Sequence, residues 1–404
     1  MGEPHPTTPA MTATRTALIG GLLTALASVS MALYTPAMPT LVAVFGTTMA
    51  MIKTSLTAFF AGFALSQLVC GPVSDAFGRR PAALVFLTLY TAGGVLALFA
   101  ETVEVLIAAR LLQGIGAAIG VGVSRALVRD LFTGEEAAHL LATISIVLSI
   151  GPAISPTLGG FLLAAFGWRA VFVAMVIFGG LALAAVVFAM PETNRHRDPA
   201  RARPGRVLAT YRDLIVDRRF LLPTLSIGFS VGAIFTLGTM LPFVLIGRVG
   251  LDPATFGIGM LAQTGSYLSG GIVARLFIPR LGAERLILPG LALGLIGAAG
   301  TLLLGRVTPL SWLSVMVPVG LFAFSIALVI PGLTTRAMTP FPKTAGSASS
   351  LLGFVQMGAG FLGGVAATAF ADPVTALGVV FPAMLAVALA ARLVDRGLGG
   401  ASVE

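Results

Sequence analysis

The stretch best suited to chemistry is a short charged segment, Gly71–Pro81, that separates two long apolar runs. Asp75 and Arg79 are four residues apart, so their side chains can form an ion pair that closes a turn or can reach a neighbouring helix. Gly78 can adopt a positive φ, which suits such a turn. Arg80 adds a second positive charge, and positive charge beside a membrane span marks the cytoplasmic side. The segment is therefore either an ordinary basic loop or a turn with a mechanical role.

A second candidate is Arg110, which lies several residues inside an apolar run. A guanidinium at membrane depth costs about 2.5–3.5 kcal/mol on insertion scales, so it should face a partner or a water-filled cavity. The alternative is that Arg110 snorkels to the outer headgroups, where Glu101 or Glu104 could pair with it.

The elements that position these residues must lie in a membrane. Of the 404 residues, 57% are hydrophobic and 10% are charged, and the mean hydropathy is +0.99; a soluble domain carries roughly 25% charged residues. The net charge of +9 could indicate nucleic acid, but the basic residues lie in short segments between apolar runs. That placement favours a bilayer with anionic headgroups as the partner, and no nucleic acid. Cys70 is the only cysteine, so no internal disulfide can form, and we expect neither a metal nor a cofactor.

Spanning helices need about 20 apolar residues. Breaks at charged and Pro- or Gly-rich points predict an all-α membrane protein with twelve spans, which cover residues 16–41, 52–72, 82–100, 104–129, 138–163, 169–190, 220–246, 254–276, 287–304, 310–334, 346–371 and 375–392. The predicted parts are a disordered tail (1–15), a six-helix half (16–190), a cytoplasmic linker (191–219), a second six-helix half (220–392) and a C-terminal tail (393–404). The two halves have similar turns after their second spans. Arg275, Gly282 and Arg285 follow the eighth span at roughly the positions at which Asp75, Gly78 and Arg80 follow the second span.

The basic residues also predict the orientation. With both termini cytoplasmic, the cytoplasmic side receives 20 Lys and Arg residues and the other side four, with Arg110 left inside a span. This distribution satisfies the positive-inside rule and predicts a multi-pass protein of a bacterial inner membrane.

Several motifs resemble those of a known family. The spacing Gly-x-x-x-Asp-x-x-Gly-Arg-Arg resembles the loop motif of major facilitator superfamily transporters, with Ala76 where arginine is usual. Arg-x-x-Gln-Gly from Arg110 resembles the fourth-helix motif of proton-linked transporters in that superfamily. The fifth span resembles the superfamily's antiporter motif at Gly151, Pro152, Pro156, Gly159 and Gly160, with Ser155 in place of a glycine. Over nearly the whole chain the finer resemblance is to the Bcr/CflA (bicyclomycin-resistance-type) drug:proton antiporters, carried by residues 33–39, 128–132, 167–172 and 340–349.

The resemblance implies roles for these residues. It implies a latch that holds the outward-facing state, in which Arg79 pairs with Asp130 and Asp75 faces Gly346–Ser347; its residues are Gly71, Asp75, Gly78, Arg79, Arg80 and Asp130. It also implies a substrate cavity walled by spans 1, 4, 7 and 10 and lined by Met31, Tyr34, Gln113, Phe235, Thr239, Met240, Phe243, Phe322 and Phe324. Apolar and neutral polar groups of this kind suit a small, hydrophobic, drug-like solute. The expected function is export of such compounds by a monomer in exchange for protons.

One departure concerns the proton. The subfamily usually has an acidic residue two positions before Tyr34, where this chain has Ala32, and no Asp or Glu lies well inside a predicted span. The remaining coupling candidates are Arg110, Asp75 and Asp130. The departure leaves open a facilitator or importer of a neutral small molecule without proton coupling. A membrane enzyme is disfavoured, because the spans hold no pair of His or carboxylate residues and the chain has no ATP-binding loop.

Overall fold

A computed structural model describes residues 10–194, 197–199, 203–304 and 309–400. These residues form fifteen α-helices: α1 (Ala13–Tyr34), α2 (Met38–Val44), α3 (Met49–Phe77), α4 (Arg79–Leu98), α5 (Val103–Ala117), α6 (Ile119–Leu131), α7 (Gly134–Phe166), α8 (Trp168–Ala189), α9 (Pro204–Val216), α10 (Arg218–Leu245), α11 (Pro253–Leu281), α12 (Ala283–Gly300), α13 (Trp312–Met338), α14 (Ala345–Thr368) and α15 (Pro373–Gly400). Within the described part of the chain, ten helical segments are long and apolar enough to cross a membrane. Helix α11 is as long but less apolar, and within α7 the segment Ile154–Phe166 is an apolar helix of shorter length.

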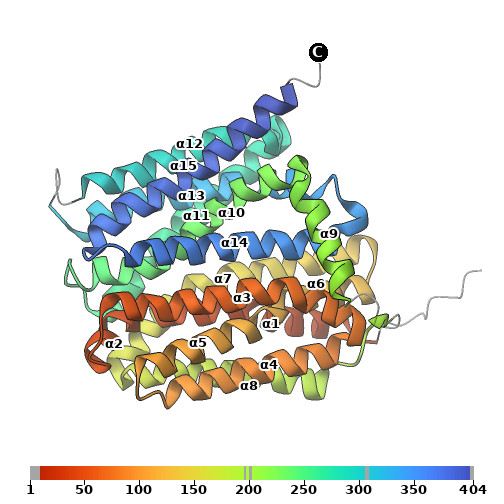
Figure 1. The fold of residues 1–404 in the computed structure, drawn as a ribbon, viewed down its shortest axis with the longest axis horizontal. Coiled ribbons are helices and arrows are strands. Elements are labelled where there is room, and N and C mark those ends of the chain that lie inside the picture. Colours follow the sequence, from red (N-terminus) through yellow and green to blue (C-terminus); the bar gives the residue numbers. More distant parts are fainter. Residues whose placement is uncertain (1–9, 195–196, 200–202, 305–308, 401–404) are drawn as a thin grey trace, which may run out of the picture.

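The long helices run roughly parallel and fall into two groups, with α1–α8 in the lower part of Figure 1 and α10–α15 in the upper part. Each group has its own apolar core, one containing Leu26, Phe59 and Tyr90 and the other Leu241 and Phe381. Helix α1 begins and α15 ends at the same end of the bundle, which we call the terminal end. Helix α3 begins at the other end, which we call the opposite end.

The first group meets the second along α3 and α14. Gln67 of α3 lies against Gly353 near the terminal end, and Thr57 lies against Gly364 nearer the opposite end. Glycine is required at the second position, because a Cβ at Gly364 would overlap the Thr57 side chain. Helices α3 and α14 therefore stay in contact over most of their length.

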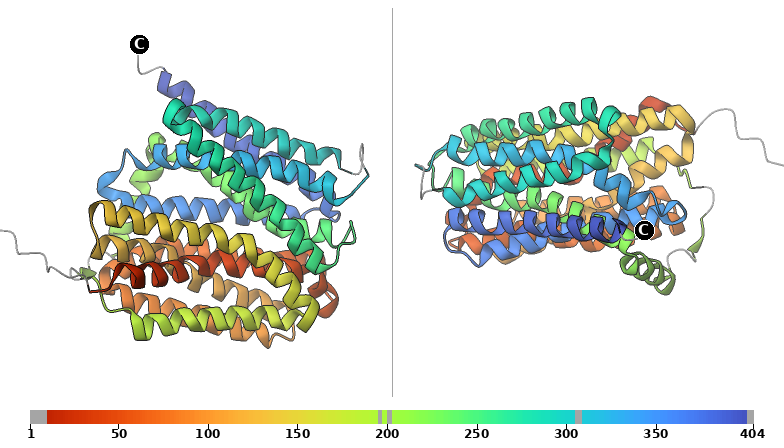
Figure 2. Two further views of the ribbon diagram at one scale, coloured as in Figure 1. Left: turned by 180° about the vertical axis from the view of Figure 1, so that it is seen from behind. Right: turned by 90° about the horizontal axis from the view of Figure 1, so that it is seen from above.

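Helices α7 and α11 form another contact between the groups, and it lies toward the opposite end. The Thr157 hydroxyl donates to the carbonyl of Gly257, 2.8 Å away, in the first turns of α11. Arg275 lies about five turns further along the same face of α11 but is exposed. There a pocket of about 520 Å³ opens between α11 and α13, lined in part by Gly271 and Ile330. Figure 2 (left) shows α7 and α11 crossing toward the opposite end and parting toward the terminal end.

Two of the expected spans are interrupted. The first, expected as 16–41, is α1 followed by a 3-10 turn at Thr35–Ala37 and then α2. Pro36 and Pro39 have no backbone N–H to donate, which explains the break in the α-helical hydrogen bonding. The fourth, expected as 104–129, is divided into α5 and α6 at Ala118. Its carbonyl instead accepts from Gln67 Nε2 at 3.5 Å and Cys70 Sγ at 3.6 Å.

The segments expected to be linker and tail contain helix. The polar segment 191–219 includes α9, and α15 continues to Gly400, beyond the expected end of the last span at 392. The charged turns after α3 and α11 share one backbone feature, a glycine with positive φ: +110° at Gly78 and +79° at Gly282. The tight turn that the sequence suggested at Gly78 thus has a counterpart at Gly282 in the second group.

Candidate functional site

Arg110 lies in the middle of α5 and is fully buried. Its Nη1 donates to Gln113 Oε1 at 2.7 Å and approaches Met175 Sδ at 3.7 Å. Its Nη2 reaches the carbonyl of Ser30 in α1 at 3.5 Å, and its Nε has no hydrogen-bond partner. Arg110 therefore points into the first group of helices rather than toward a headgroup layer.

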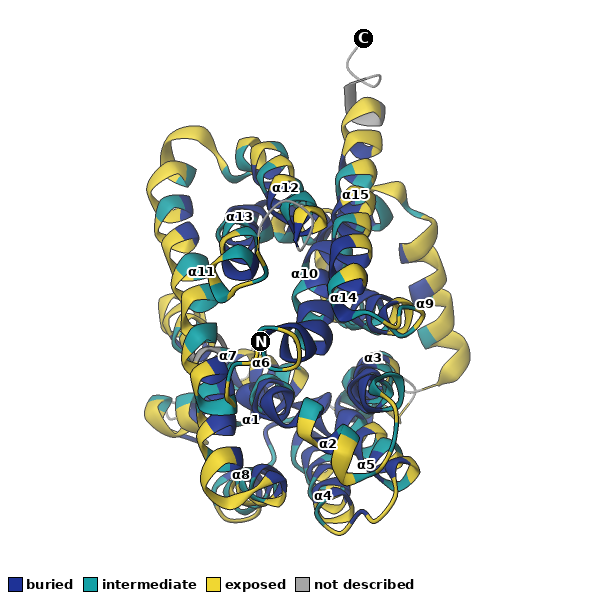
Figure 3. Ribbon diagram, turned by 90° about the vertical axis from the view of Figure 1, so that its left-hand side faces the viewer, coloured by how far each residue is buried: buried dark blue, intermediate teal, exposed yellow. Residues whose placement is uncertain are grey.

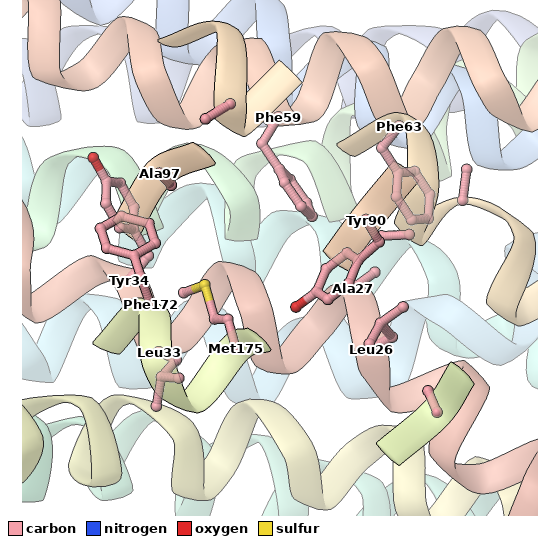
Figure 4. Close-up of a cluster of buried hydrophobic side chains, with 14 of the residues drawn as sticks. Leu26, Ala27, Leu33, Tyr34, Phe59, Phe63, Tyr90, Ala97, Phe172 and Met175 are labelled. Carbon is pink, nitrogen blue, oxygen red and sulfur yellow. The ribbon is translucent and has the colours of Figure 1, made fainter. Parts of the chain in front are cut away.

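Two aromatic rings enclose the same guanidinium. Its central carbon lies 4.6 Å from the ring centre of Tyr34 and 4.5 Å from that of Phe59. Contacts of this kind contribute about 0.5–2 kcal/mol each. Figure 4 shows Tyr34, Phe59 and Met175 gathered in this core, with Tyr90 nearby. The Tyr34 hydroxyl is hydrogen-bonded to Ser55 Oγ at 2.6 Å, and that of Tyr90 to Ser30 Oγ.

No carboxylate is among the contacts described for Arg110. Glu101 and Glu104, the partners considered for it, are both exposed. The site is thus a cation held by an amide, a thioether, a carbonyl and two π faces. Such a cation is available to balance negative charge that enters the space around it, because no resident anion neutralises it.

The residues expected to line the cavity fall into three places. Tyr34 and Gln113 surround Arg110, with Met31 half-buried on α1. Two others sit where the groups meet, since the Phe235 ring lies 5.7 Å from that of Phe60 and Phe243 packs against the core of α1–α8.

The remaining expected lining residues lie within the second group. The Phe322 ring packs edge-on against Phe381 with 4.7 Å between ring centres. Met240 is fully buried in the same core, and the Thr239 hydroxyl donates to the Thr236 carbonyl at 2.7 Å. Phe324 on α13 is half-buried. The structure therefore does not bring all nine side chains to one surface.

The charged turn forms a compact cluster at the terminal end. Arg79 is buried, pairs with Asp75, donates to Ser74 Oγ at 2.8 Å and lies 3.1 Å from Asp130 Oδ2 at the end of α6. Arg80 instead donates to the carbonyl of Val187 in α8 at 2.8 Å. Arg79 thus joins α3, α4 and α6 within the first group.

Sequence reasoning missed three neighbours of this cluster that follow α8. Glu192 Oε1 accepts from the backbone N–H of Arg79 at 3.0 Å, and its Oε2 accepts from that of Arg80 at 3.2 Å. Thr193 donates to Asp130 at 3.3 Å, and Asn194 donates to the Asp75 carbonyl at 2.9 Å. Glu192 lies 113 residues from Arg79, so only the fold reveals that it satisfies free N–H groups at the start of α4.

The small residues of the fifth-span motif set how closely α7 approaches its neighbours. A Cβ at Gly159 would overlap the Leu33 carbonyl in α1, and one at Gly160 would overlap the Pro253 carbonyl in α11. Gly151 faces Ser28 of α1, with 3.2 Å between the Cβ position and Oγ. Pro152 and Pro156 both lie inside α7, which continues through them.

The second group carries its own charged cluster, which the sequence did not indicate. Arg336 at the end of α13 makes a two-point ion pair with Asp395 of α15, with distances of 2.6 and 3.0 Å. Arg392 pairs with Asp395 at 2.5 Å and also with Glu284 at the start of α12. The described contacts in this cluster thus involve residues other than Arg275 and Arg285, on which the sequence comparison of the two turns rested.

Lys53 is the other functional candidate that the sequence did not single out. It is fully buried near the start of α3, where Nζ donates to the Ala367 carbonyl of α14 at 3.2 Å and lies 5.6 Å from the ring centre of Phe243. Asp372, in the turn after α14, lies near this contact. Burial acts to raise the pKa of Asp372, but hydrogen bonds from Thr375 and the charge of Arg248 outweigh it and hold that pKa below its usual value.

A further polar contact crosses between the groups, this one at the terminal end. Arg125 Nη1 of α6 donates to Ser349 Oγ of α14 at 2.9 Å. Across the described residues, no group of three or more His, Cys, Asp or Glu side chains could hold a metal ion.

Comparison with known proteins identifies relatives over most of the chain. The family profile described as Major Facilitator Superfamily matches residues 20–364. A bicyclomycin resistance protein homolog of Haemophilus influenzae is 27% identical over 313 residues, covering 78% of each chain. The multidrug transporter MdfA of Yersinia pestis is 27% identical over 325 residues, covering 80% of this chain and 78% of that protein.

A solved structure, the D-xylose-proton symporter, superposes with a TM-score of 0.73 at 15% identity. It covers 95% of this chain and 97% of its own. At that level of identity the likeness concerns the fold alone.

Proposed function

The chain belongs to the Major Facilitator Superfamily, whose members are transporters rather than enzymes, and we propose that it exports small, largely hydrophobic, drug-like compounds across the bacterial inner membrane by alternating access. Protons moving inward drive the export. The names of the bicyclomycin-resistance and multidrug relatives support the substrate class.

The observation that carries the proposal is the environment of Arg110. A buried cation without a carboxylate, faced by Tyr34 and Phe59, offers apolar and π surface together with one positive charge. Such a site accommodates flat, apolar compounds of low charge better than sugars, which need many hydrogen-bonding groups. Its fixed positive charge also interacts strongly with any nearby group that gains or loses a proton, because electrostatic interactions are strong in an apolar interior.

The architecture that we propose has twelve spans in two six-helix halves that rock about a central site. The spans are α1–α2, α3, α4, α5–α6, α7 and α8, then α10, α11, α12, α13, α14 and α15. The halves cover 16–190 and 220–392, with 191–219 as the cytoplasmic linker between them and 1–15 and 393–404 as tails. The terminal end is the cytoplasmic end, in line with the distribution of Arg and Lys, and the transporter works as a monomer in a bilayer with anionic headgroups.

Asp75, Arg79 and Asp130, with Gly71, Gly78 and Arg80, form the latch in this proposal. In the arrangement described here α7 and α11 part at the terminal end, and the Arg79 cluster is closed within the first half. We propose that in the outward-facing state Asp75 turns to the start of α14, near Gly346–Ser347. A carboxylate at a helix N-terminus gains about 0.3–1 kcal/mol.

Proton coupling in this proposal uses Asp75 or Asp130 at the cytoplasmic mouth, with Arg110 supplying a fixed positive field. The antiporter motif of Gly151, Pro152, Pro156, Gly159 and Gly160 keeps α7 close to α1 and α11, so that movement of one half is passed to the other. The substrate contacts are assigned to Tyr34, Gln113 and Met31, and, where the halves meet, to Phe235 and Phe243. Thr239, Met240, Phe322 and Phe324 support that wall from within the second half.

A facilitator or importer of a neutral small molecule is the second candidate. It is favoured by Ala32, which is buried in α1 where an acidic residue would supply an interior proton site. Such a protein needs only alternating access, without a titrating group.

Reconstitution separates the two candidates. Liposomes with the purified protein, a pH-sensitive dye inside and an imposed proton gradient are exposed to a panel of neutral and cationic antibacterial compounds. Proton movement that depends on the compound supports antiport. Compound flux without proton movement supports the facilitator, and absence of flux for every compound contradicts drug export.

A further inference from the structure

Helix α9 lies at the terminal end, outside both groups of long helices. In Figure 1 it runs across the direction of the long helices, and in the end-on view of Figure 3 it lies at the perimeter beside α14 and α3. Because the long helices follow the membrane normal, a helix across them at the end of the bundle lies in the plane of the membrane surface. Its position at the perimeter places it over lipid rather than over the centre of the protein.

One face of α9 is fastened to both groups. Tyr211 and Leu214 are buried against a cluster that includes Leu351 of α14. The Tyr211 hydroxyl donates to the carbonyl of Leu68 in α3 at 2.9 Å. Burial raises the pKa of Tyr211 to about 12, although a hydrogen bond with Ser350 acts against this shift. The hydroxyl therefore stays protonated as a donor, and α9 has a fixed rotation about its axis.

That rotation leaves an apolar stripe uncovered. Leu208 and Ile215 are seven residues apart, so they share a face, and they are 65% and 45% exposed. Leu208 comes three residues before Tyr211 and Ile215 four residues after it, so the stripe lies next to the face that is fastened to the bundle. It runs along the outer surface of the bundle. Val216, at the end of the helix, is 74% exposed.

Basic residues accompany this stripe. Residues 203–219 contain five arginines and two aspartates, a net charge of +3. Arg206, Arg212 and Arg218 are exposed. Arg212 follows Leu208 by one turn, so its aliphatic stem can lie over the apolar surface while its guanidinium reaches a headgroup. An apolar stripe flanked by arginine is the pattern of helices that lie in the membrane interface and attract anionic lipid.

We propose that α9 is an interfacial helix whose Leu208–Ile215 stripe enters the cytoplasmic leaflet and whose arginines bind anionic phospholipid headgroups. Because α9 is fastened to α3 and to α14, lipid bound there acts on the contact between the two groups. The proposal rests on the bundle spanning a membrane and is independent of the transported compound and of proton coupling.

Site-directed spin labelling tests the placement of the stripe. Leu208→Cys and Asp213→Cys are labelled in separate full-length proteins, with the buried Cys70 left in place and the unlabelled parent as background. The proteins are placed one per nanodisc, in phosphatidylcholine with or without phosphatidylglycerol. We expect the label at 208 to collide preferentially with oxygen, which concentrates in lipid, and the label at 213 with a water-soluble nickel chelate.

Two outcomes would overturn this placement. Equal nickel accessibility at both positions in both lipids would mean that the stripe faces water. The label at 208 could instead be shielded from nickel only in concentrated detergent solution and accessible to nickel in nanodiscs that hold one copy. That result would mean that the stripe binds a second copy of the chain.

Lipid binding is tested separately by counting phosphatidylglycerol molecules that remain bound in native mass spectra. We expect the double variant Arg206→Gln/Arg212→Gln to lower the apparent affinity for phosphatidylglycerol at least fivefold relative to phosphatidylcholine. The matched control, Arg280→Gln/Arg285→Gln, removes two exposed arginines at the same end of the bundle but away from α9 and should keep the affinity. Equal loss in both variants, or no loss in the first, would contradict a site on α9.

Discussion

At the scale of single residues, replacing Arg110 should affect transport far more than stability, because no carboxylate among its described contacts neutralises its charge. Arg110→Met removes the cost of burying a guanidinium, about 2.5–3.5 kcal/mol. It also leaves Gln113 without its partner, which costs about 1–3 kcal/mol. We therefore expect the unfolding free energy to change by about 2.5 kcal/mol at most, while proton-coupled flux in liposomes falls at least tenfold.

Arg110→Lys is the matched control, because it keeps the positive charge but loses the planar contact with Tyr34 and Phe59. We expect it to retain part of the coupled flux. Full coupled flux in Arg110→Met would remove Arg110 from the coupling mechanism. A Met variant that does not fold would make the residue structural.

The carboxylates around Arg79 differ in burial, and this difference predicts an order of stability losses. The side chain of Asp130 is 16% exposed and that of Asp75 is 33% exposed, whereas Arg79 is 5% exposed. Asp130→Asn should lower the unfolding free energy by about 1.5–3 kcal/mol, because it weakens a charge-assisted bond to a buried guanidinium. Asp75→Asn should cost about 1 kcal/mol or less, because water screens its pair with Arg79.

Unfolding in mixed detergent measures both variants, with Asp213→Asn as the control because Asp213 and its partner Arg212 are more than two-thirds exposed. Equal losses for Asp75→Asn and Asp130→Asn would contradict the burial argument. Intact pH-driven flux in both variants would contradict the proposal that either carboxylate couples protons, whatever the stability of the variants.

At the scale of helices, glycine decides how the first group packs. A Cβ at Gly114 of α5 would overlap the backbone of Phe59 in α3, so the two helices touch through their main chains. Gly122 of α6 has open space at its Cβ position. Gly114→Ala should therefore lower the unfolding free energy by about 1–3 kcal/mol through overpacking. Gly122→Ala should raise it by up to about 1 kcal/mol through helix propensity.

Denaturation of both alanine variants in the same detergent gives the comparison. Because each change adds one methyl group to the same span, the difference between them reports packing rather than composition. A Gly114 variant as stable as the Gly122 variant would show that α3 and α5 can separate at no cost.

The sequence allows prediction of helices more readily than of their contacts. Long apolar runs and charged breaks reveal where spans begin and end, because a bilayer admits few other structures. The interruption at Ala118 was not predicted, since it depends on Gln67 and Cys70 reaching its carbonyl from another helix. The pair of Asp75 and Arg79 is visible in the sequence because the two are one helical turn apart. Lys53 and Ala367 are over 300 residues apart, so only the fold reveals their contact.

At the scale of the whole molecule, the two groups carry matching clusters with inverted charge. In the first, Arg79 at the start of α4 meets Asp130 at the end of α6, and Glu192 follows α8. In the second, an acid, Glu284, stands at the start of α12 and a base, Arg336, at the end of α13. Each cluster ties three helices of its own group at the terminal end, so we expect each group to move there as a unit. The contacts that decide which end opens must then lie between the groups.

Lys53 supplies such a contact at the opposite end. Its bond to the Ala367 carbonyl and its position beside the Phe243 ring hold α3 against α14 and α10. Lys53→Met keeps the length of the side chain but removes the charge and the donor, which should weaken this contact by about 1–2 kcal/mol. A change of that size shifts the ratio of two conformations about 5–30-fold. We therefore expect Lys53→Met to favour the conformation that is open at the opposite end.

Spin labels at Phe99 and Leu303, both exposed and on different groups at the opposite end, report this shift as a longer distance in double electron–electron resonance. Lys53→Arg, which keeps a charged donor, should leave the distance distribution close to that of the parent. If Lys53→Met also leaves it unchanged, the opposite end is held by other contacts between the groups, such as that between α7 and α11. In that case Thr157→Val should lengthen the distance between the labels and open the opposite end. The reason is that the carbonyl of Gly257 in α11 then loses the hydrogen bond from Thr157 in α7.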